Sequence, residues 1–283
     1  MARYKGSRKP PGQKKPPLTH FLCLPLVTPD SRPHLEESLR YFRDAHAAGR
    51  DDSPELVVPG MHPKAIRAVG ALHCTLGVMS LDKQKLEQAI ETLQGLDRAV
   101  SSLERPVSPP LLNRSSEPLK INLTGLVSMH NPRNTSILYS APADLSERLY
   151  PFCLEVQRQF ADRGFLVPDD RQLKLHATIV NTIYAKGRTK RPPPKWKQKL
   201  REETPEPEAA PTTSTSGHGP FANAPLKIDA TTILERFKEF VWAEGVVLDR
   251  IAICEMGAKK ITDAAGKLIG EEYSEVASVK LPT

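Results

Sequence analysis

The 283-residue chain has few cysteines and few aromatic residues, and it lacks long apolar runs. Its four cysteines, at positions 23, 74, 153 and 254, are widely scattered and form no C-x-x-C pair. This distribution excludes the common zinc modules and a disulfide scaffold, and it is typical of a reducing compartment. The longest apolar runs, such as residues 21–27, fall far short of the roughly 20 residues that a membrane helix needs. We therefore expect no transmembrane helix and no membrane partner.

Positive charge is concentrated in two segments of the chain. Residues 1–16 hold six Lys or Arg and no acid, and residues 186–201 hold eight and no acid, whereas the remainder carries a net charge of −7. Residues 1–16 also lack the apolar core of a secretory signal, so we expect no secretory leader. The two basic segments predict contacts with nucleic acid or with the nuclear import machinery. The alternative is that they are solvated tails that only aid solubility.

Apolar periodicity and turn residues predict strands and helices in an irregular order. The expected strands are residues 20–27, 71–81, 119–129, 137–141, 173–184, 246–256 and 273–279. One helix is expected to begin with Ser31 as its N-cap, and others to cover residues 63–69, 82–103, 144–163 and 229–242. The order has no strict βαβ rhythm and no glycine-rich phosphate loop, which disfavours Rossmann and P-loop folds. It predicts a mixed α+β fold with largely antiparallel sheets.

The composition changes abruptly in two places and thereby divides the chain. Residues 1–17 are rich in Pro and Lys and are predicted to be a disordered basic tail. Residues 18–283 are predicted to form one folded domain. Within it, residues 187–226 combine eight prolines with a basic block, an acidic block and a Ser/Thr/Gly stretch. We expect this segment to be a disordered insertion, because patterned sequence resumes after it.

Two of the expected strands carry the same short pattern, His-x-Thr flanked by aliphatic residues. The first copy holds His73 and Thr75, and the second holds His176 and Thr178. Alternate residues of a strand share a face, so each strand presents one imidazole and one hydroxyl on the same side. Two such strands facing one groove would surround a single ligand with two proton-transferring imidazoles and two neutral hydroxyl donors. This set predicts in-line displacement at a phosphodiester without a metal ligand.

The tandem motifs are similar to those that define the 2H phosphoesterase superfamily. Residues 20–25, 72–79, 173–182 and 253–257 further resemble one of its subgroups, the A-kinase anchoring protein 7-like phosphoesterase domain. That domain also occurs in activating signal cointegrator complex subunit 1, which the second motif block resembles most. The animal subunit carries a KH RNA-binding domain before it, whereas here only a basic segment of about 17 residues precedes the domain, so we expect no KH domain.

The resemblance implies a bilobal fold with two pseudo-symmetric antiparallel sheets, flanked by helices around a central cleft. It also implies that His73, Thr75, His176 and Thr178 take the catalytic positions, with no cofactor and no metal. The expected activity is metal-independent phosphodiester cleavage of RNA ends or oligonucleotides, at a 2′,3′-cyclic phosphate or a 2′-5′ linkage. Either histidine is a candidate for the base. The alternative is a non-catalytic nucleotide- or RNA-binding subunit of an activating signal cointegrator-like complex, with roles in transcription regulation and DNA repair.

Four further residues are candidates for substrate binding. Lys174 lies on the same side of its strand as His176 and either meets a phosphate or reaches solvent. Tyr184 either stacks a base or packs in the core, and Met256 either floors the cleft or only packs. His20 opens the first strand and is a candidate for the groove. The expected partners are an RNA or nucleotide ligand and cointegrator-complex subunits; outside a complex we expect a monomer, in the nucleus, the cytoplasm or both.

Overall fold

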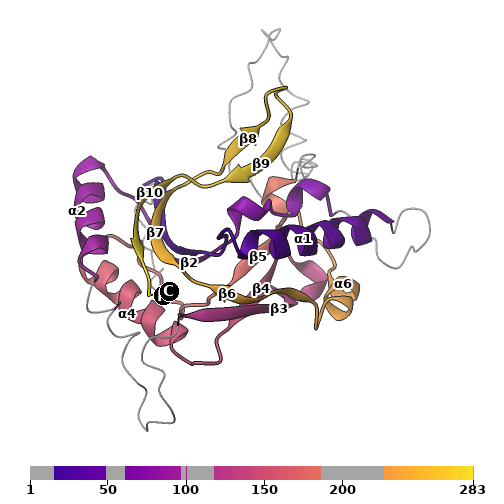
Figure 1. The fold of residues 1–283 in the computed structure, drawn as a ribbon, viewed down its shortest axis with the longest axis horizontal. Coiled ribbons are helices and arrows are strands. Elements are labelled where there is room, and N and C mark those ends of the chain that lie inside the picture. Colours follow the sequence, from indigo (N-terminus) through magenta and orange to yellow (C-terminus); the bar gives the residue numbers. More distant parts are fainter. Residues whose placement is uncertain (1–15, 49–60, 97–99, 101–117, 186–225, 283) are drawn as a thin grey trace, which may run out of the picture.

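The computed structural model describes residues 16–48, 61–96, 100, 118–185 and 226–282, and a large curled sheet dominates this part of the chain (Figure 1). The strands of the large sheet are β1 (His20–Pro25), β2 (His73–Met79), β3 (Lys120–Ser128), β4 (Ile137–Ala143), β5 (Ala177–Asn181), β6 (Val241–Val247), β7 (Arg250–Glu255) and β10 (Glu275–Lys280). A separate hairpin consists of β8 (Lys259–Thr262) and β9 (Leu268–Glu272), and it projects away from the body of the molecule.

Helices and short 3-10 turns connect these strands. The α-helices are α1 (Ser31–Ala48), α2 (Lys83–Gln94), α4 (Leu149–Asp162) and α6 (Thr231–Arg236). The 3-10 turns are η2 (Pro63–Ala65), η3 (Val69–Ala71), η4 (Pro132–Asn134) and η5 (Thr182–Tyr184). The expected α+β class with antiparallel strands is confirmed. No described helix has both the length and the apolar character that crossing a bilayer requires.

The order of the strands shows how the two expected halves are joined. The large sheet has the order β10-β7-β1-β2-β5-β4-β3-β6, and its paired strands are antiparallel. The first four strands belong to one half and the last four to the other. β2 and β5 meet at the centre through one residue pair, Cys74 with Ala177. The two half-sheets are therefore continuous at their motif strands and are not separate layers.

The main core lies on the face of the sheet that the helices cover. Leu22 and Leu24 of β1 and Leu76 of β2 are fully buried there against apolar side chains of α1, α2 and α4. The helices also tie the halves together, because Ser38 of α1 donates to the Trp242 carbonyl in β6 (2.8 Å). On the opposite face, a smaller buried cluster consists of Phe21, Cys23, Ala252 and Cys254.

Several expected boundaries are corrected by backbone and capping contacts. The first intrahelical bond of α1 runs from Arg32 N to Thr28 O, and Thr28 and Ser31 exchange side-chain to backbone hydrogen bonds. Thr28 is therefore the N-cap, and Ser31 completes a reciprocal cap. The helix expected over 229–242 ends at Arg236, because Trp242 is the second residue of β6. The strand expected over 246–256 is divided between β6 and β7.

The strand expected over residues 173–184 is shorter than its apolar pattern suggests. β5 covers Ala177–Asn181, and the chain then turns into η5. The hairpin of β8 and β9 was not expected, since its residues are largely polar and exposed. The predicted disorder of residues 1–17 and 187–226 falls almost entirely outside the described residues, so both predictions stand untested.

Gly125 provides a test of the packing between β3 and the segment before β6. It has a φ of +73°, and a Cβ added there would lie 2.5 Å from the Lys238 carbonyl oxygen. We expect Gly125→Ala to lower the free energy of unfolding by about 3 kcal/mol, because the backbone strain of a positive φ adds to the clash of the new Cβ with the Lys238 carbonyl oxygen. Gly164 is the matched control: its φ is +70°, but nothing lies within 4 Å of an added Cβ. Gly164→Ala should cost only about 1 kcal/mol. Equal losses in urea titrations of the two variants would contradict this packing.

Candidate active site

The two His-x-Thr motifs lie side by side on neighbouring antiparallel strands. Cys74 of β2 pairs with Ala177 of β5, and both side chains are buried. An antiparallel register with this pair places His73 opposite Thr178, and Thr75 opposite His176. Segments about 100 residues apart in the sequence are thus brought together at the centre of the sheet.

All four motif side chains share one face of the sheet. Cys74 and Ala177 belong to the main core on the helix-covered face, so the residues that flank them point the other way. We call the face that carries His73, Thr75, His176 and Thr178 the motif face. The two histidines occupy diagonal positions, at which Cα atoms are roughly 7–8 Å apart. The two imidazoles and two hydroxyls therefore border one common area.

A β-bulge stands beside each motif at an equivalent position. In β1–β2 the register shifts between Leu22 and Cys23, so that Cys23 pairs with Thr75. In β4–β5 it shifts between Leu138 and Tyr139, so that Tyr139 pairs with Thr178. In both halves the extra residue is the aliphatic one that follows the motif threonine. Bulges bend a strand and re-aim its side chains, and here they act on both motifs in the same way.

Each motif histidine is held by the backbone two residues before it. His73 Nδ1 lies 2.9 Å from the Ala71 carbonyl, and His176 Nδ1 lies 2.7 Å from the Lys174 carbonyl. A carbonyl oxygen only accepts hydrogen bonds, so Nδ1 carries the proton in both rings. The lone pair of each neutral imidazole is then on Nε2. Both histidines thereby present the same nitrogen for proton transfer.

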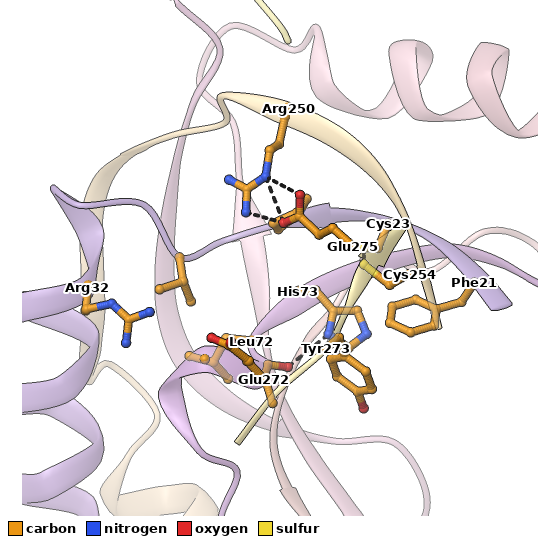
Figure 2. Close-up of a pocket in the computed structure, with 14 residues that line it drawn as sticks. Phe21, Cys23, Arg32, Leu72, His73, Arg250, Cys254, Glu272, Tyr273 and Glu275 are labelled. Atoms are coloured by element: carbon orange, nitrogen blue, oxygen red, sulfur yellow. Dashed lines mark hydrogen bonds and ion pairs between the residues drawn. The ribbon is translucent and has the colours of Figure 1, made fainter. Parts of the chain in front are cut away.

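His73 is enclosed by aromatic rings and has a strongly altered acidity. Figure 2 shows the Phe21 and Tyr273 rings beside the His73 ring. Their centroids lie 4.9 and 5.1 Å from that of His73. Burial, which disfavours the cation, and the smaller effects of the Arg67 and His176 charges together lower the pKa of His73 to about 4, although the hydrogen bond to the Ala71 carbonyl acts in the opposite direction. His73 is therefore neutral over the whole physiological pH range.

His176 has a more open environment than His73. It precedes the first residue of β5 and is only partly buried. The Tyr139 ring meets its imidazole edge-on at a centroid distance of 5.6 Å, and Lys174 Nζ lies 4.9 Å from the centroid of that tyrosine ring. The predicted candidate Lys174 is thus exposed but lies in the immediate surroundings of His176. The two histidines have matching anchors but different surroundings.

The other three predicted binding residues differ in where the structure places them relative to the motif strands. Tyr184 ends η5 and lies under the Arg67 guanidinium, with 4.1 Å between Cζ and the ring centroid. Met256 follows β7, two strands from β2, and its backbone contacts Thr19. His20 alternates with Phe21, so it points to the helix-covered face, and the structure does not bring it to the motif face.

Two residues that adjoin the site could not be identified from the sequence. Arg67 lies between η2 and η3 and is 5% exposed, and its Nη2 donates to the Tyr273 hydroxyl (3.2 Å). Tyr273 follows β9, and burial raises its pKa. Neither residue belongs to a motif, and both reach the site only through tertiary contacts. The one available signal, an aromatic residue at the start of the expected strand 273–279, did not suggest a role.

A cavity of about 100 Å³ adjoins His73 but does not contain the whole constellation (Figure 2). His73 lines it, whereas Thr75, His176 and Thr178 do not. Its charged wall includes Arg250, which already pairs with Glu275 and Asp249, and a further carboxylate, Glu272. The paired charge and the extra carboxylate make this cavity a poor anion site. Within the described residues, no cluster of three or more His, Cys, Asp or Glu side chains is arranged to hold a metal ion.

Comparison with known proteins identifies the family. Residues 18–269 match the family described as the AKAP7 2′5′ RNA ligase-like domain. The chain belongs to this family. The AKAP7 2′5′ RNA ligase-like domain is a 2H phosphoesterase domain, so the resemblance inferred from the tandem His-x-Thr motifs is confirmed. The match begins just before β1 and extends into β9, and it therefore includes both motif strands.

Two curated relatives share weak sequence similarity with this member of the family. Activating signal cointegrator 1 complex subunit 1 of Mus musculus is 26% identical over 180 residues, which are 62% of this chain and 45% of the mouse protein. An uncharacterized protein of Schizosaccharomyces pombe is 21% identical over 262 residues, which are 92% of this chain and 95% of the yeast protein. The chain thus spans less than half of the mouse relative but nearly all of the yeast one.

Solved structures of similar proteins include two nucleotide complexes. Escherichia coli LigT complexed with 3′-AMP is 12% identical, with a TM-score of 0.44, and the match covers 94% of this chain and 99% of LigT. Kluyveromyces marxianus Usb1 with uridine monophosphate is 10% identical, with a TM-score of 0.40, and the match covers 94% of this chain and 97% of Usb1.

Proposed function

We propose that this AKAP7 2′5′ RNA ligase-like domain cleaves phosphodiesters, with His73 and His176 as the acid/base pair. The observation that carries the proposal is the pairing of Cys74 with Ala177, since this register puts both histidines and both threonines on one face. Thr75 and Thr178 hold the non-bridging oxygens through their hydroxyls and stabilise the charge that builds up at the pentavalent stage. No step requires a redox change or a group that the chain does not supply.

The different surroundings of the two histidines support a division of roles. His73 is enclosed and lies near the Arg67 cation, so it is neutral and suits the base. His176 is partly exposed and can be recharged with a proton from solvent, so it suits the acid. His73 Nε2 removes a proton from water as the water oxygen bonds to phosphorus. His176 starts this step as an imidazolium, with protons on both ring nitrogens, and donates its Nε2 proton to the ribose oxygen as the phosphorus–oxygen bond to that ribose breaks.

The substrate that fits this chemistry best is an RNA end or oligonucleotide. A 2′,3′-cyclic phosphate or a 2′-5′ linkage has a ribose hydroxyl as its leaving group, which needs protonation by an acid such as His176. Two basic segments, residues 1–16 and 186–201, favour a polyanionic substrate. Both segments are predicted to aid binding and not to take part in the chemistry.

A substrate panel tests this function directly. The purified chain is incubated in EDTA with nucleoside 2′,3′-cyclic phosphates, RNA ending in a cyclic phosphate, and 2′-5′ and 3′-5′ oligonucleotides. We expect product from at least one of the first three classes, unchanged by EDTA, and none in the double variant His73→Ala/His176→Ala. His130→Ala is the matched control, because His130 is exposed and outside the motifs. Full loss of turnover in EDTA, restored by a divalent cation, would refute the metal-independent mechanism.

The similarity to the mouse cointegrator subunit favours one second candidate function. In this alternative the motif face binds a nucleotide or RNA end without cleaving it, and the domain serves as a subunit of a cointegrator-like complex. Roles in transcription regulation and DNA repair, and a location in the nucleus or cytoplasm, depend on this alternative or on the basic segments and remain predictions. Micromolar binding of the panel ligands with no product would favour the binding subunit over the enzyme.

A further inference from the structure

Arg67 is a buried cation beside the motif face. Its guanidinium lies over the Tyr184 ring and donates to the Tyr273 hydroxyl, and the residue is 5% exposed. Its backbone is fixed as well, because Arg67 N donates to the Ile179 carbonyl (2.8 Å) and the Arg43 guanidinium donates to the Arg67 carbonyl (2.7 Å). The backbone of Arg67 is therefore anchored by β5 and α1, and its guanidinium is held against two tyrosine side chains.

Among the residues that the structure describes, Arg67 has no carboxylate partner. Its polar contacts in this part of the chain are to a tyrosine hydroxyl and to backbone groups, and no described Asp or Glu lies within 4 Å of its guanidinium. Arg250, by contrast, pairs with Asp249 and Glu275. A buried charge without a counter-ion is costly, so a protein that retains one gains from an anion that arrives later.

Arg67 lies close to the motif residues, so an anion bound to it would be near the proposed reaction. Ile179, to which its backbone is bonded, directly follows Thr178 in β5. The Tyr273 ring lies between the His73 ring, 5.1 Å away, and the Arg67 Cζ, 6.0 Å away. The guanidinium is thus adjacent to the His73–Thr178 end of the constellation but separated from the area between the two histidines by an aromatic ring. It is placed to meet a neighbouring group of the substrate and not the reacting phosphorus.

Tyr184 provides the access that a ligand of Arg67 needs. The tyrosine covers the guanidinium on one side but is itself 45% exposed. An exposed side chain changes rotamer within nanoseconds, so moving this one ring uncovers the guanidinium without disturbing the sheet. An aromatic ring with this exposure can also stack on a base, as aromatic residues do in single-strand binding sites.

We propose that Arg67 binds a second phosphate of the substrate, next to the phosphate that is cleaved, with Tyr184 stacking on the adjoining base. The proposal rests on the proposed function for the position of the first phosphate. A guanidinium matches phosphate oxygens with parallel donors, and the phosphate supplies the missing negative charge. The site therefore prefers ligands with two phosphates, such as an oligonucleotide end, over a mononucleotide with one.

Binding of two small probes tests the proposal without depending on turnover. Adenosine 3′,5′-bisphosphate and 3′-AMP are titrated calorimetrically into the wild-type chain and into Arg67→Gln and Arg67→Lys. A charge-assisted hydrogen bond predicts a roughly 10- to 100-fold weaker Kd of Arg67→Gln for the bisphosphate, with less than a 3-fold change for 3′-AMP. Arg67→Lys should bind the bisphosphate more tightly than Arg67→Gln does but less tightly than the wild type. Lysine keeps the positive charge but lacks the two parallel N–H donors of the guanidinium. Arg163→Gln, an exposed arginine at the end of α4, is the control and should change neither Kd.

The possible outcomes separate this inference from the proposed function. Equal weakening of both probes, or none, in Arg67→Gln overturns the second phosphate site, provided that urea unfolding shows the variant folded. A wild-type chain that cleaves the panel yet binds both probes equally overturns this inference alone. A chain that binds the bisphosphate through Arg67 but cleaves nothing supports this inference and refutes the proposed enzyme.

Discussion

Replacement of His176 by alanine is expected to lower kcat on a 2′,3′-cyclic phosphate by about 10²- to 10⁴-fold, the usual contribution of an acid/base group. On an RNA-like phosphodiester with a p-nitrophenolate leaving group, the same variant should lose less than about 10-fold. The reason is that p-nitrophenolate departs without protonation, so the acid is no longer needed. Steady-state kinetics on the two substrates measure the difference.

His73→Ala is the counterpart that makes this test specific. The base is needed to activate the nucleophile whatever the leaving group, so this variant should lose about 10²- to 10⁴-fold on both substrates. The two imidazoles have equivalent Nδ1 anchors, but His73 also packs against Phe21 and Tyr273, so urea unfolding of each variant is measured beside the kinetics to show that both are folded. If His73→Ala is instead the variant whose kcat loss is small on the p-nitrophenyl substrate, the roles of the two histidines are reversed. If both variants lose as much kcat on this substrate as on the cyclic phosphate, His176 does not protonate the leaving group.

The motif residues could be predicted from the sequence because their pattern is local. Alternation in a strand fixes that His73 and Thr75 share a face, and the same holds for His176 and Thr178. The sequence did not give the register between the strands, which depends on burial of Cys74 and Ala177 in a core built by distant helices. The structure adds this register and, with it, the diagonal arrangement of the two imidazoles.

Other features could not be predicted because tertiary packing decides them. Leu175 and the residues before it continue the apolar pattern of β5, yet the strand begins at Ala177. Trp242 fits a helical pattern, but it belongs to β6, where its indole donates to the Gly125 carbonyl and packs against Phe42 and Phe237. Arg67 lies in no regular element and becomes important only because Tyr184 and Tyr273, far away in the sequence, lie against it.

The symmetry of the backbone and the asymmetry of the side chains have separate consequences. The paired bulges and the paired Nδ1 anchors are equivalent in the two halves, so both histidines offer Nε2 on the motif face. The rings around them differ: within the described ranges, Phe21 and Tyr273 enclose His73, whereas one ring, that of Tyr139, adjoins His176. A symmetric frame can thus support an asymmetric reaction, because proton affinity depends on burial and charge and not on backbone geometry.

The pH dependence of kcat/KM tests the enclosure of His73. Burial lowers the pKa of this residue to about 4, so the base stays neutral, and active, down to about pH 4. The acidic limb of wild-type kcat/KM should therefore fall near pH 4, well below the usual histidine value of about 6.5. The charged and titratable groups around the ring are Arg67, His176 and Tyr273, with Cys23, Cys254, Glu272 and Glu275 lining the adjoining cavity.

Two substitutions of Tyr273 separate burial from hydrogen bonding as the cause of this low pKa. Tyr273→Ala removes the ring that lies 5.1 Å from the His73 ring and admits water. Water stabilises the imidazolium, so the acidic limb should move up by as much as about 2 pH units toward 6.5. Tyr273→Phe keeps the ring and loses only the hydroxyl that accepts from Arg67, so its limb should stay within about 0.5 unit of wild type. A wild-type limb already near pH 6.5, or equal shifts in both variants, would show that burial by this ring does not set the proton affinity of the base.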